Sequence, residues 1–197
     1  QDELQYFVVP KNGKIEYVNE KVTPEEMTFF DPCMGSGHIL VYAFDVLMEI
    51  YRECGYVDRD AAQAIIENNL FGLDIDNRAY QLAYFAIMMK ARSYDRRFLT
   101  RKIQPNVAAI VETNAINQFY CEGITNDKEF NKIGEYLVQA FKHAKEIGSL
   151  ISVEGKDYVA FKEYLDSCNV LGQITIDSGN WYKEVLPLMK KIVKQAD

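Results

Sequence analysis

Apolar residues between positions 37 and 54 recur three and four residues apart, which is the period of an α-helix that buries one face. Gly55 ends this repeat, as glycine commonly does at a helix C-terminus. A second helix is predicted from Asp58, a good N-terminal capping residue, to Asn68. A third is predicted from Asn77 to about Tyr94, with one side made of Leu82, Phe85, Ala86 and Met89.

Short apolar runs alternate with these helices. After at most one helical turn at Thr23–Glu26, Met27–Phe30 predicts a buried strand that ends at Asp31-Pro32. Leu70–Leu73 and Asn106–Val111 predict two more short strands. This alternation is typical of an α/β fold, here with three parallel strands covered by helices and joined by right-handed crossovers.

The two ends of the chain have different patterns. Two β-prone runs, Gln5–Val9 and Ile15–Val18, flank Asn12-Gly13, which predicts a β-hairpin. Beyond Phe119 the pattern predicts a strand at Gln173–Ile176 and amphipathic helices at Asp127–Ile147, Asp157–Cys168 and Trp181–Gln195. We therefore expect an N-terminal hairpin over residues 1–22, an α/β half-domain over 23–118 and a helical insertion or cap over 119–197.

Composition narrows the class of protein. A chain of 197 residues with 48% hydrophobic content is long and apolar enough for a globular domain. Neither a run of eighteen apolar residues nor a secretory signal is present, so we expect a cytoplasmic protein without a membrane span. The net charge of −7 opposes non-specific binding to DNA. Four dispersed cysteines and two histidines support neither a disulfide framework nor a metal site.

The segment DPCMGSGH, from Asp31 to His38, joins a predicted strand to a predicted helix. Glycines there bring bare backbone and a helix N-terminus against a ligand, an arrangement that suits a carboxylate or phosphate. A dinucleotide loop would have glycine where Leu40 stands, and a nucleotide triphosphatase loop would have a lysine. The remaining alternatives are an ordinary tight turn and a nucleoside site, in which Asp31 would face an ammonium group and Gly35–Gly37 a carboxylate and ribose.

A second acid follows the next predicted strand. In doubly wound folds, a carboxylate at the end of the second strand hydrogen-bonds ribose hydroxyls. Asp74 occupies that place, whereas Asp76 is better placed to cap the helix that begins at Asn77. The separation of Asp74 from Gly37 exceeds the usual spacing of about twenty residues. The predicted extra helix at Asp58–Asn68 accounts for the excess.

These two motifs resemble those of a known family. FFDPCMGSGHILVYAFDVL resembles the first motif of the amino-methyltransferases, commonly D-P-x-x-G-S-G, and NLFGLDID resembles their second. Phe30–Asn114 is most similar to the adenine-specific DNA methyltransferases of BREX (Pgl) phage-defence systems and of related restriction-modification systems. The resemblance implies a partial Rossmann-like class I methyltransferase fold, S-adenosyl-L-methionine as cofactor, and DNA as partner.

The resemblance also implies roles for single residues. The loop of Asp31, Pro32, Gly35, Ser36 and Gly37 would hold the methionine part of the cofactor. Asp74 would bind the ribose hydroxyls, and Ile75 would pack on the adenine face. Asn114 stands where the family usually has an aspartate that accepts a hydrogen bond from the adenine amino group. Because an amide carbonyl still accepts such a bond, we expect weaker cofactor binding, not its loss.

The family's catalytic tetrapeptide, N/D-P-P-Y/F/W, is absent from the sequence, in which no two prolines are adjacent. That segment holds the flipped target adenine. We therefore expect a cofactor-binding fragment of a DNA adenine-N6 methyltransferase, inactive alone and without catalytic residues of its own, whose remaining parts lie beyond Asp197. The alternative is a non-catalytic protein-interaction domain. A small-molecule or protein methyltransferase complete in itself is disfavoured because no later strand motif exists.

Two surface features remain. Lys90–Lys102 holds six basic residues against one acid, Asp95, which predicts either a contact with a phosphate backbone or a solvated helix end. The first strand has an unpaired edge in a three-stranded sheet, and such edges recruit partners. We expect that edge to be covered by the Gln173–Ile176 strand or by a second copy of the chain in a homodimer.

Overall fold

The structure, a computed structural model, describes residues 11, 13, 22–114, 128–153, 158–167, 186, 189–190 and 192–193. Contacts divide the chain into two compact units. The first comprises Gln1–Gly72 and Arg78–Val107, and the second comprises Leu73–Asn77 and Ala108–Asp197. In the part of the chain that the structure describes, no helix is long and apolar enough to cross a membrane.

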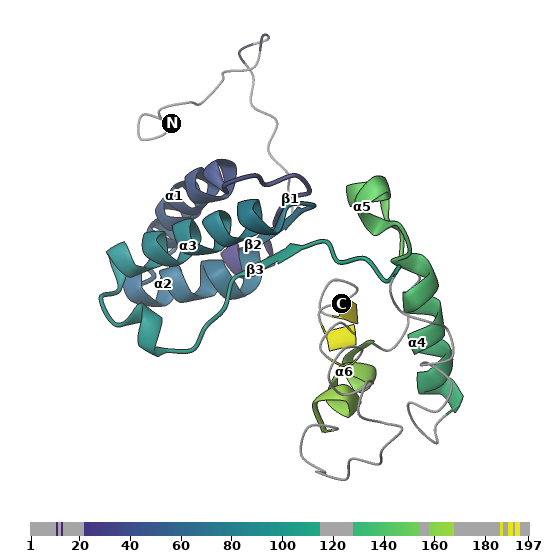
Figure 1. The fold of residues 1–197 in the computed structure, drawn as a ribbon. Coiled ribbons are helices and arrows are strands. Elements are labelled where there is room, and N and C mark those ends of the chain that lie inside the picture. The colour runs from purple at the N-terminus through teal and green to yellow at the C-terminus, as the bar shows by residue number, and fades with distance from the viewer. Residues whose placement is uncertain are drawn as a thin grey trace. The chain divides into compact units, whose positions relative to one another are not determined.

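The α/β part contains three parallel strands flanked by helices, which confirms the predicted fold class (Figure 1). The strands lie in the order β1-β2-β3, and β1 pairs with β2 so that Phe29 faces Leu70 and Asp31 faces Gly72. The elements are η1 (Pro24–Glu26), β1 (Phe29–Asp31), α1 (His38–Glu53), α2 (Asp58–Ala64), the π-helical η2 (Ile65–Asn69), β2 (Leu70–Asp74), α3 (Asn77–Tyr94), η3 (Phe98–Thr100) and β3 (Asn106–Ala109).

Helix α1 shows how the sequence sets an element and its end. Its buried residues recur three and four apart, and they are Leu40, Phe44, Leu47, Met48 and Tyr51. At the C-terminus, Gly55 adopts a φ of +87° and donates to the carbonyl of Arg52 at 2.9 Å, while the next N–H, of Tyr56, donates to the carbonyl of Tyr51 at 3.0 Å. These paired bonds form a Schellman motif, which satisfies carbonyls that the helix leaves open.

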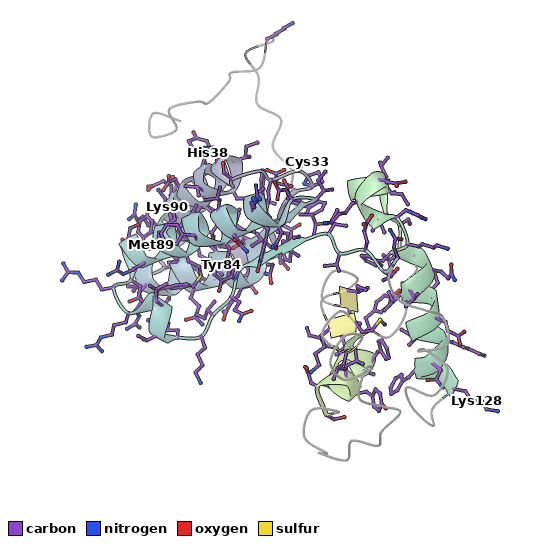
Figure 2. The ribbon with its side chains drawn as sticks, in the orientation of Figure 1. Cys33, His38, Tyr84, Met89, Lys90 and Lys128 are labelled. Atoms are coloured by element: carbon purple, nitrogen blue, oxygen red, sulfur yellow. The ribbon has the colours of Figure 1, made fainter. Side chains whose placement is uncertain are left out.

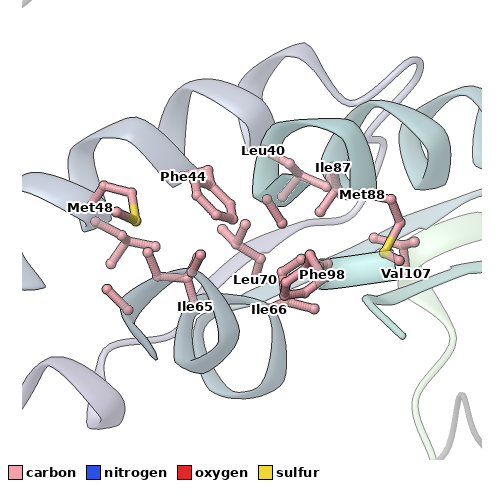
Figure 3. Packing of buried hydrophobic residues seen from close by; sticks show 14 of the residues in the cluster. Leu40, Phe44, Met48, Ile65, Ile66, Leu70, Ile87, Met88, Phe98 and Val107 are labelled. Atoms are coloured by element: carbon pink, nitrogen blue, oxygen red, sulfur yellow. The ribbon is translucent and has the colours of Figure 1, made fainter. Parts of the chain in front are cut away.

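The core of the first unit lies where the helices meet the sheet. Figure 3 shows Leu40, Phe44 and Met48 of α1 packed with residues of η2, β2, α3, η3 and β3. Those partners include Ile65, Ile66, Leu70, Ile87, Met88, Phe98 and Val107. Each fully buried side chain of this kind contributes roughly 1.5–3 kcal/mol relative to exposure. The cluster therefore holds the ends of the strands in a fixed register.

A buried polar link attaches the segment before β1 to the core. The hydroxyl of Tyr51 donates to Oδ1 of Asn69 at 3.0 Å. The amide of Asn69 in turn donates to the carbonyls of Pro24 at 2.7 Å and Met27 at 2.6 Å. Asn69 and Tyr51 have no exposed surface, so these bonds satisfy groups that water does not reach.

Besides the ends of β2 and β3, the described part of the second unit consists of helices. They are α4 (Lys128–Ala140), α5 (Ala144–Ile147), η5 (Gly148–Leu150) and α6 (Tyr158–Ser167). They share a second cluster of buried residues that includes Ile133, Leu137, Phe161 and Leu165. Helix α6 confirms the helix predicted at Asp157–Cys168.

The single helix predicted at Asp127–Ile147 is wrong, because a turn at residues 141–143 separates α4 from α5. His143 lies in this turn with a φ of +57°. Two side chains from a segment distant in sequence stabilise this turn. Oδ1 of Asn114 accepts the N–H of His143 at 3.0 Å, and the hydroxyl of Thr113 donates to the carbonyl of Val138 at 2.6 Å. Tertiary hydrogen bonds thus replace the helical bonds that periodicity alone predicts.

Burial corrects two further expectations. Strand β1 is not a buried strand, since Phe29 is 38% and Phe30 54% exposed, and the sheet as described ends at this strand. On α3, the side that carries Leu82 and Phe85 faces solvent, while the adjacent side is buried through Ala83, Ile87, Met88 and Ala91. The two strands of the predicted hairpin, Gln5–Val9 and Ile15–Val18, and the strand at 173–176 lie outside the described residues, as does most of the helix predicted at 181–195.

Candidate cofactor site

The glycine loop lies between β1 and α1 and is shaped by two glycines with positive φ. Gly35 has a φ of +54° and Gly37 a φ of +82°, values that residues with a side chain rarely adopt. The N–H of Gly37 donates to the carbonyl of Met34 at 2.8 Å, which closes the turn directly before α1. Cys33 and His38 mark the two ends of this turn in Figure 2.

Helix α1 begins without a side-chain cap. Gly37 holds the capping position, and in the described part of the chain no side chain caps the first turn of the helix. The first N–H groups of an α-helix have no partner within the helix, and together with the helix dipole they attract an anion. The start of α1 therefore offers several backbone donors beside the loop.

The loop is fixed in place by close packing. A Cβ atom on Gly37 would lie 2.9 Å from Cβ of Ala83, so α1 and α3 approach closely at this point. Met34 is 4% exposed, and its sulfur lies 2.7 Å from where a Cβ on Gly72 of β2 would be. Sequence reasoning missed Met34, although an apolar residue inside a loop of small and polar residues is a signal for such an anchor.

Asp31 closes β1 and is the charged residue of the loop. Its side chain is buried, with 8% exposed. Oδ1 accepts the N–H of Cys33 at 3.1 Å, but Oδ2 is buried and has no hydrogen-bond partner among the residues that the structure describes. A buried carboxylate oxygen without a donor is unfavourable by about 1–3 kcal/mol or more, so native proteins rarely retain one without a reason.

The other loop residues predicted for the site differ in exposure. Pro32 is exposed, Ser36 and Gly35 are half-buried, and Gly37 is buried. These residues and Asp31 belong to one continuous stretch of the first unit, so the structure brings this part of the predicted site together.

Asp74, Ile75 and Asn114 belong to the second unit. Asp74 is the last residue of β2, and its Oδ1 accepts the N–H of Asp76 at 2.8 Å. Ile75 is 51% exposed, an unusual exposure for an isoleucine. Asn114 is exposed, and its carbonyl oxygen accepts the N–H of His143.

Among the described residues, no three histidine, cysteine, aspartate or glutamate side chains come together in a way that could hold a metal ion. The ligands that the loop can offer are one carboxylate oxygen, backbone N–H groups and a close backbone surface. A carboxylate oxygen is complementary to a cation, and backbone N–H groups at a helix start are complementary to an anion.

Comparison with known proteins gives close relatives, although no protein-family model matches the chain. The chain is 48% identical over 131 residues to the adenine-specific methyltransferase PglX of Lacticaseibacillus casei, a match that covers 66% of the chain and 11% of that protein. It is 32% identical over 226 aligned positions to the adenine-specific methyltransferase BrxX of Escherichia coli O9:H4, which covers 100% of the chain and 18% of that protein. The chain thus spans less than a fifth of the length of these curated relatives.

Proposed function

The chain belongs to the family of adenine-specific methyltransferases, and from that premise we propose that its glycine loop binds the methionine part of S-adenosyl-L-methionine. This cofactor supplies an activated methyl group. The chain's own contribution is to bind and orient the cofactor, and the residues of the loop fit its amino-acid end.

Oδ2 of Asp31 carries this proposal. It is buried and has no donor among the described residues, while Oδ1 is already bonded to the N–H of Cys33. An ammonium group donates up to three hydrogen bonds and would neutralise the carboxylate, and a charge-assisted bond of this kind is about twice as strong as a neutral one. Asp31 is therefore the residue that would hold the amino group of the cofactor.

The start of α1 suits the opposite end of the amino acid. The uncapped N–H groups of its first turn are donors for a carboxylate, and the helix of 16 residues provides a full dipole. Gly35 and Gly37 leave the backbone bare on the approach to these donors. A zwitterionic ligand would thus find a carboxylate and an anion site within one loop.

For the nucleoside part of the cofactor we propose Asp74, Ile75 and Asn114. Asp74 ends a strand and would accept hydrogen bonds from ribose hydroxyls. Ile75 offers an exposed apolar side chain for the adenine face. Asn114 would accept a hydrogen bond from the adenine amino group through the second lone pair of its carbonyl oxygen, since the first lone pair accepts the N–H of His143.

The proposed reaction of the complete enzyme is transfer of the methyl group to N6 of adenine in DNA. No adjacent prolines occur in this chain, so the family's adenine-holding tetrapeptide is not part of it. We therefore expect the chain alone to bind the cofactor without methylating DNA. A transfer assay with radiolabelled cofactor and duplex DNA measures this directly, and label in DNA adenine would contradict it.

Thermal unfolding with two ligands tests the role of Asp31. A ligand at about 100 times its dissociation constant stabilises the native state by about 2.7 kcal/mol. S-adenosyl-L-methionine has the amino-acid end that Asp31 would hold, whereas 5′-methylthioadenosine lacks it. At equal concentration, we expect S-adenosyl-L-methionine to raise the melting temperature of the wild type more than 5′-methylthioadenosine does. In Asp31→Asn, the two ligands should raise the melting temperature equally.

The Asp31→Asn variant is also expected to fold. The substitution keeps the shape of the side chain and removes a buried charge that the described residues leave half-satisfied, so its melting temperature without ligand should equal or exceed that of the wild type. If the two ligands shift the melting temperature of Asp31→Asn as they shift that of the wild type, Asp31 does not hold the amino group of the cofactor.

A second candidate function is a protein-interaction domain that keeps a methyltransferase-like fold. The exposed apolar side of α3 favours it, because Leu82 is 58% and Phe85 63% exposed. The ligand experiment separates the two functions. A folded chain without any response to the cofactor would support the interaction domain.

A further inference from the structure

The segment from the end of α3 to β3 exposes several cations. Arg92, Arg96, Arg97 and Lys102 are all exposed, and none of them forms an ion pair with a residue that the structure describes. Four such cations within eleven residues are unexpected in a chain whose net charge is −7. We call these four residues the basic surface.

The two remaining cations of this segment, Lys90 and Arg101, form ion pairs within the protein. Lys90 pairs with Asp45 at 2.6 Å. Arg101 pairs with Asp95 at 2.8 Å and donates to Gln63 at 2.8 Å. Asp95 is the only acid between Lys90 and Lys102, and it is 7% exposed. The basic surface therefore has no exposed carboxylate within its own segment.

The helix dipole explains only part of this charge. A cation is stabilised by the dipole within the last turn of a helix, and the effect is lost beyond it. Arg92 lies in the last turn of α3, which ends at Tyr94. Arg96, Arg97 and Lys102 come after the end of the helix, so the helix dipole does not explain why these positions are basic.

The segment that presents these cations is ordered by internal contacts. Phe98 is fully buried and anchors η3 in the core. The N–H of Arg97 donates to Oδ1 of Asp95 at 3.0 Å, and the hydroxyl of Thr100 donates to the carbonyl of Arg97 at 2.7 Å. A fixed backbone lowers the entropy lost when its side chains bind a ligand.

We propose that Arg92, Arg96, Arg97 and Lys102 bind the phosphate backbone of duplex DNA. Exposed arginine and lysine side chains contact phosphates without reading sequence, and they fix the position of a protein on the duplex. The core of a protein–protein interface is depleted of charge, so four exposed cations without an ion pair among the described residues fit a polyanion better than a protein surface. The proposal gives this chain a direct contact with the DNA substrate proposed for the complete enzyme.

The position of the basic surface sets its role. Helix α3 starts directly after β2 and has 18 residues, so at 1.5 Å per residue its two ends are about 27 Å apart. Because Gly37 of the loop contacts Ala83 in the first half of α3, the basic surface lies at the other end of the helix from the loop. It would hold DNA away from the reacting base.

A nearby acid offers a sensitive control. Oε1 of Gln63 accepts the hydrogen bond from Arg101, and Nε2 of Gln63 donates to the carboxylate of Glu67 at 3.2 Å. Glu67 is exposed and is joined through Gln63 to Arg101, the residue before Lys102, so its charge would repel a phosphate backbone bound there. We expect Glu67→Gln to tighten DNA binding about twofold, as removal of one screened surface charge should.

Fluorescence anisotropy with a labelled duplex of about 20 base pairs tests the proposal, over salt concentrations from about 50 to 200 mM and without cofactor. The key variant is Arg96→Gln combined with Arg97→Gln. The matched control is Lys142→Gln with Lys145→Gln, which removes the same charge from exposed positions of the second unit. Circular dichroism checks that all variants are folded.

We expect wild-type binding to weaken with salt, and the arginine double variant to lower the slope of log affinity against log salt by about two. Its affinity at the lowest salt should fall on the order of tenfold, while the lysine control changes less than about twofold. No binding by the wild type, or equal losses in both double variants, would overturn the proposal.

A polyglutamate competitor distinguishes DNA from an acidic protein. Binding to polyglutamate that depends on Arg96 and Arg97, with no binding to DNA, would overturn the proposal in favour of a protein partner. The inference rests on the proposed DNA substrate, but the anisotropy experiment contains no cofactor. A failure to bind DNA would therefore say nothing about the role of Asp31 in cofactor binding. A failure to bind the cofactor would likewise say nothing about DNA binding by the basic surface.

Discussion

At the scale of single residues, Gly37 is subject to two separate constraints. Its φ of +82° disfavours any side chain, and a Cβ would lie 2.9 Å from Cβ and 3.0 Å from Cα of Ala83. Gly35 is subject to one constraint only, since its φ is +54° but, apart from its chain neighbours, no atom of the described residues lies within 4 Å of the position that a Cβ would take. The pair therefore separates backbone strain from crowding.

We predict that Gly37→Ala lowers the free energy of unfolding by about 2–4 kcal/mol, the sum of strain and overpacking. Gly35→Ala should lower it by about 1 kcal/mol, from strain alone. Urea denaturation followed by circular dichroism measures both values. Equal losses in the two variants would show that the contact between Gly37 and Ala83 is not a tight one.

Tyr51 links stability to alkaline pH. Burial is the main cause that raises the pKa of its hydroxyl to about 12, from about 10 in an unfolded chain. Because the folded state favours the neutral phenol, this stabilisation is fully present below pH 10 and is lost as the pH rises through about 12.

We predict that Tyr51→Phe lowers the free energy of unfolding at neutral pH by about 1–3 kcal/mol, because Oδ1 of Asn69 loses its donor. The same change should flatten the fall in stability between pH 10 and about 12. Tyr56→Phe is the control at neutral pH, since Tyr56 is exposed and its change should lower the free energy of unfolding less than Tyr51→Phe does. It does not serve as a control for the alkaline slope, because the hydrogen bond to Glu25 raises the pKa of Tyr56 as well. An unchanged alkaline slope in Tyr51→Phe would show that the Tyr51 hydroxyl does not control stability in this range.

At the scale of elements, α3 has two apolar sides and buries the one with smaller residues. Ala83, Ile87, Met88 and Ala91 are buried, whereas Leu82 and Phe85 are exposed. We predict that Ile87→Ala lowers the free energy of unfolding by about 2–5 kcal/mol and Phe85→Ala by less than about 0.5 kcal/mol. Urea denaturation of the two variants decides this. A larger loss for Phe85→Ala would mean that its side is the packed one.

The same helix shows what periodicity predicts and what it does not. The repeat in residues 77–94 predicted the existence and both ends of α3 correctly. It did not predict the buried side, because both sides carry apolar residues three and four apart. The close approach at Gly37 requires a small residue opposite, and Ala83 rather than Leu82 or Phe85 meets that requirement.

Long-range hydrogen bonds account for the other differences. The break between α4 and α5 depends on Asn114, which is 29 positions before His143, and no local pattern signals such a pair. The glycine loop was predictable because its strand end, positive φ glycines and helix start are consecutive in sequence. The role of Asn114 toward a cofactor, like the partner that covers the edge of β1, stays a prediction.

At the scale of the whole chain, the two units contain different parts of the predicted site. The first holds Asp31 and the glycine loop, and the second holds Asp74, Ile75 and Asn114. The chain matches 11% and 18% of the length of its two relatives. We therefore propose cofactor binding for this chain and DNA methylation for the complete enzyme.

The most direct test of the central claim is calorimetric titration of the chain with S-adenosyl-L-methionine, using the wild type, Asp31→Asn and the charge-matched control Glu53→Gln at the exposed end of α1. We predict one-to-one binding by the wild type and the control. Asp31→Asn should lose affinity on the order of tenfold or more, since the ammonium group loses a charged acceptor. No binding by the wild type, or equal affinities in all three proteins, would contradict the claim.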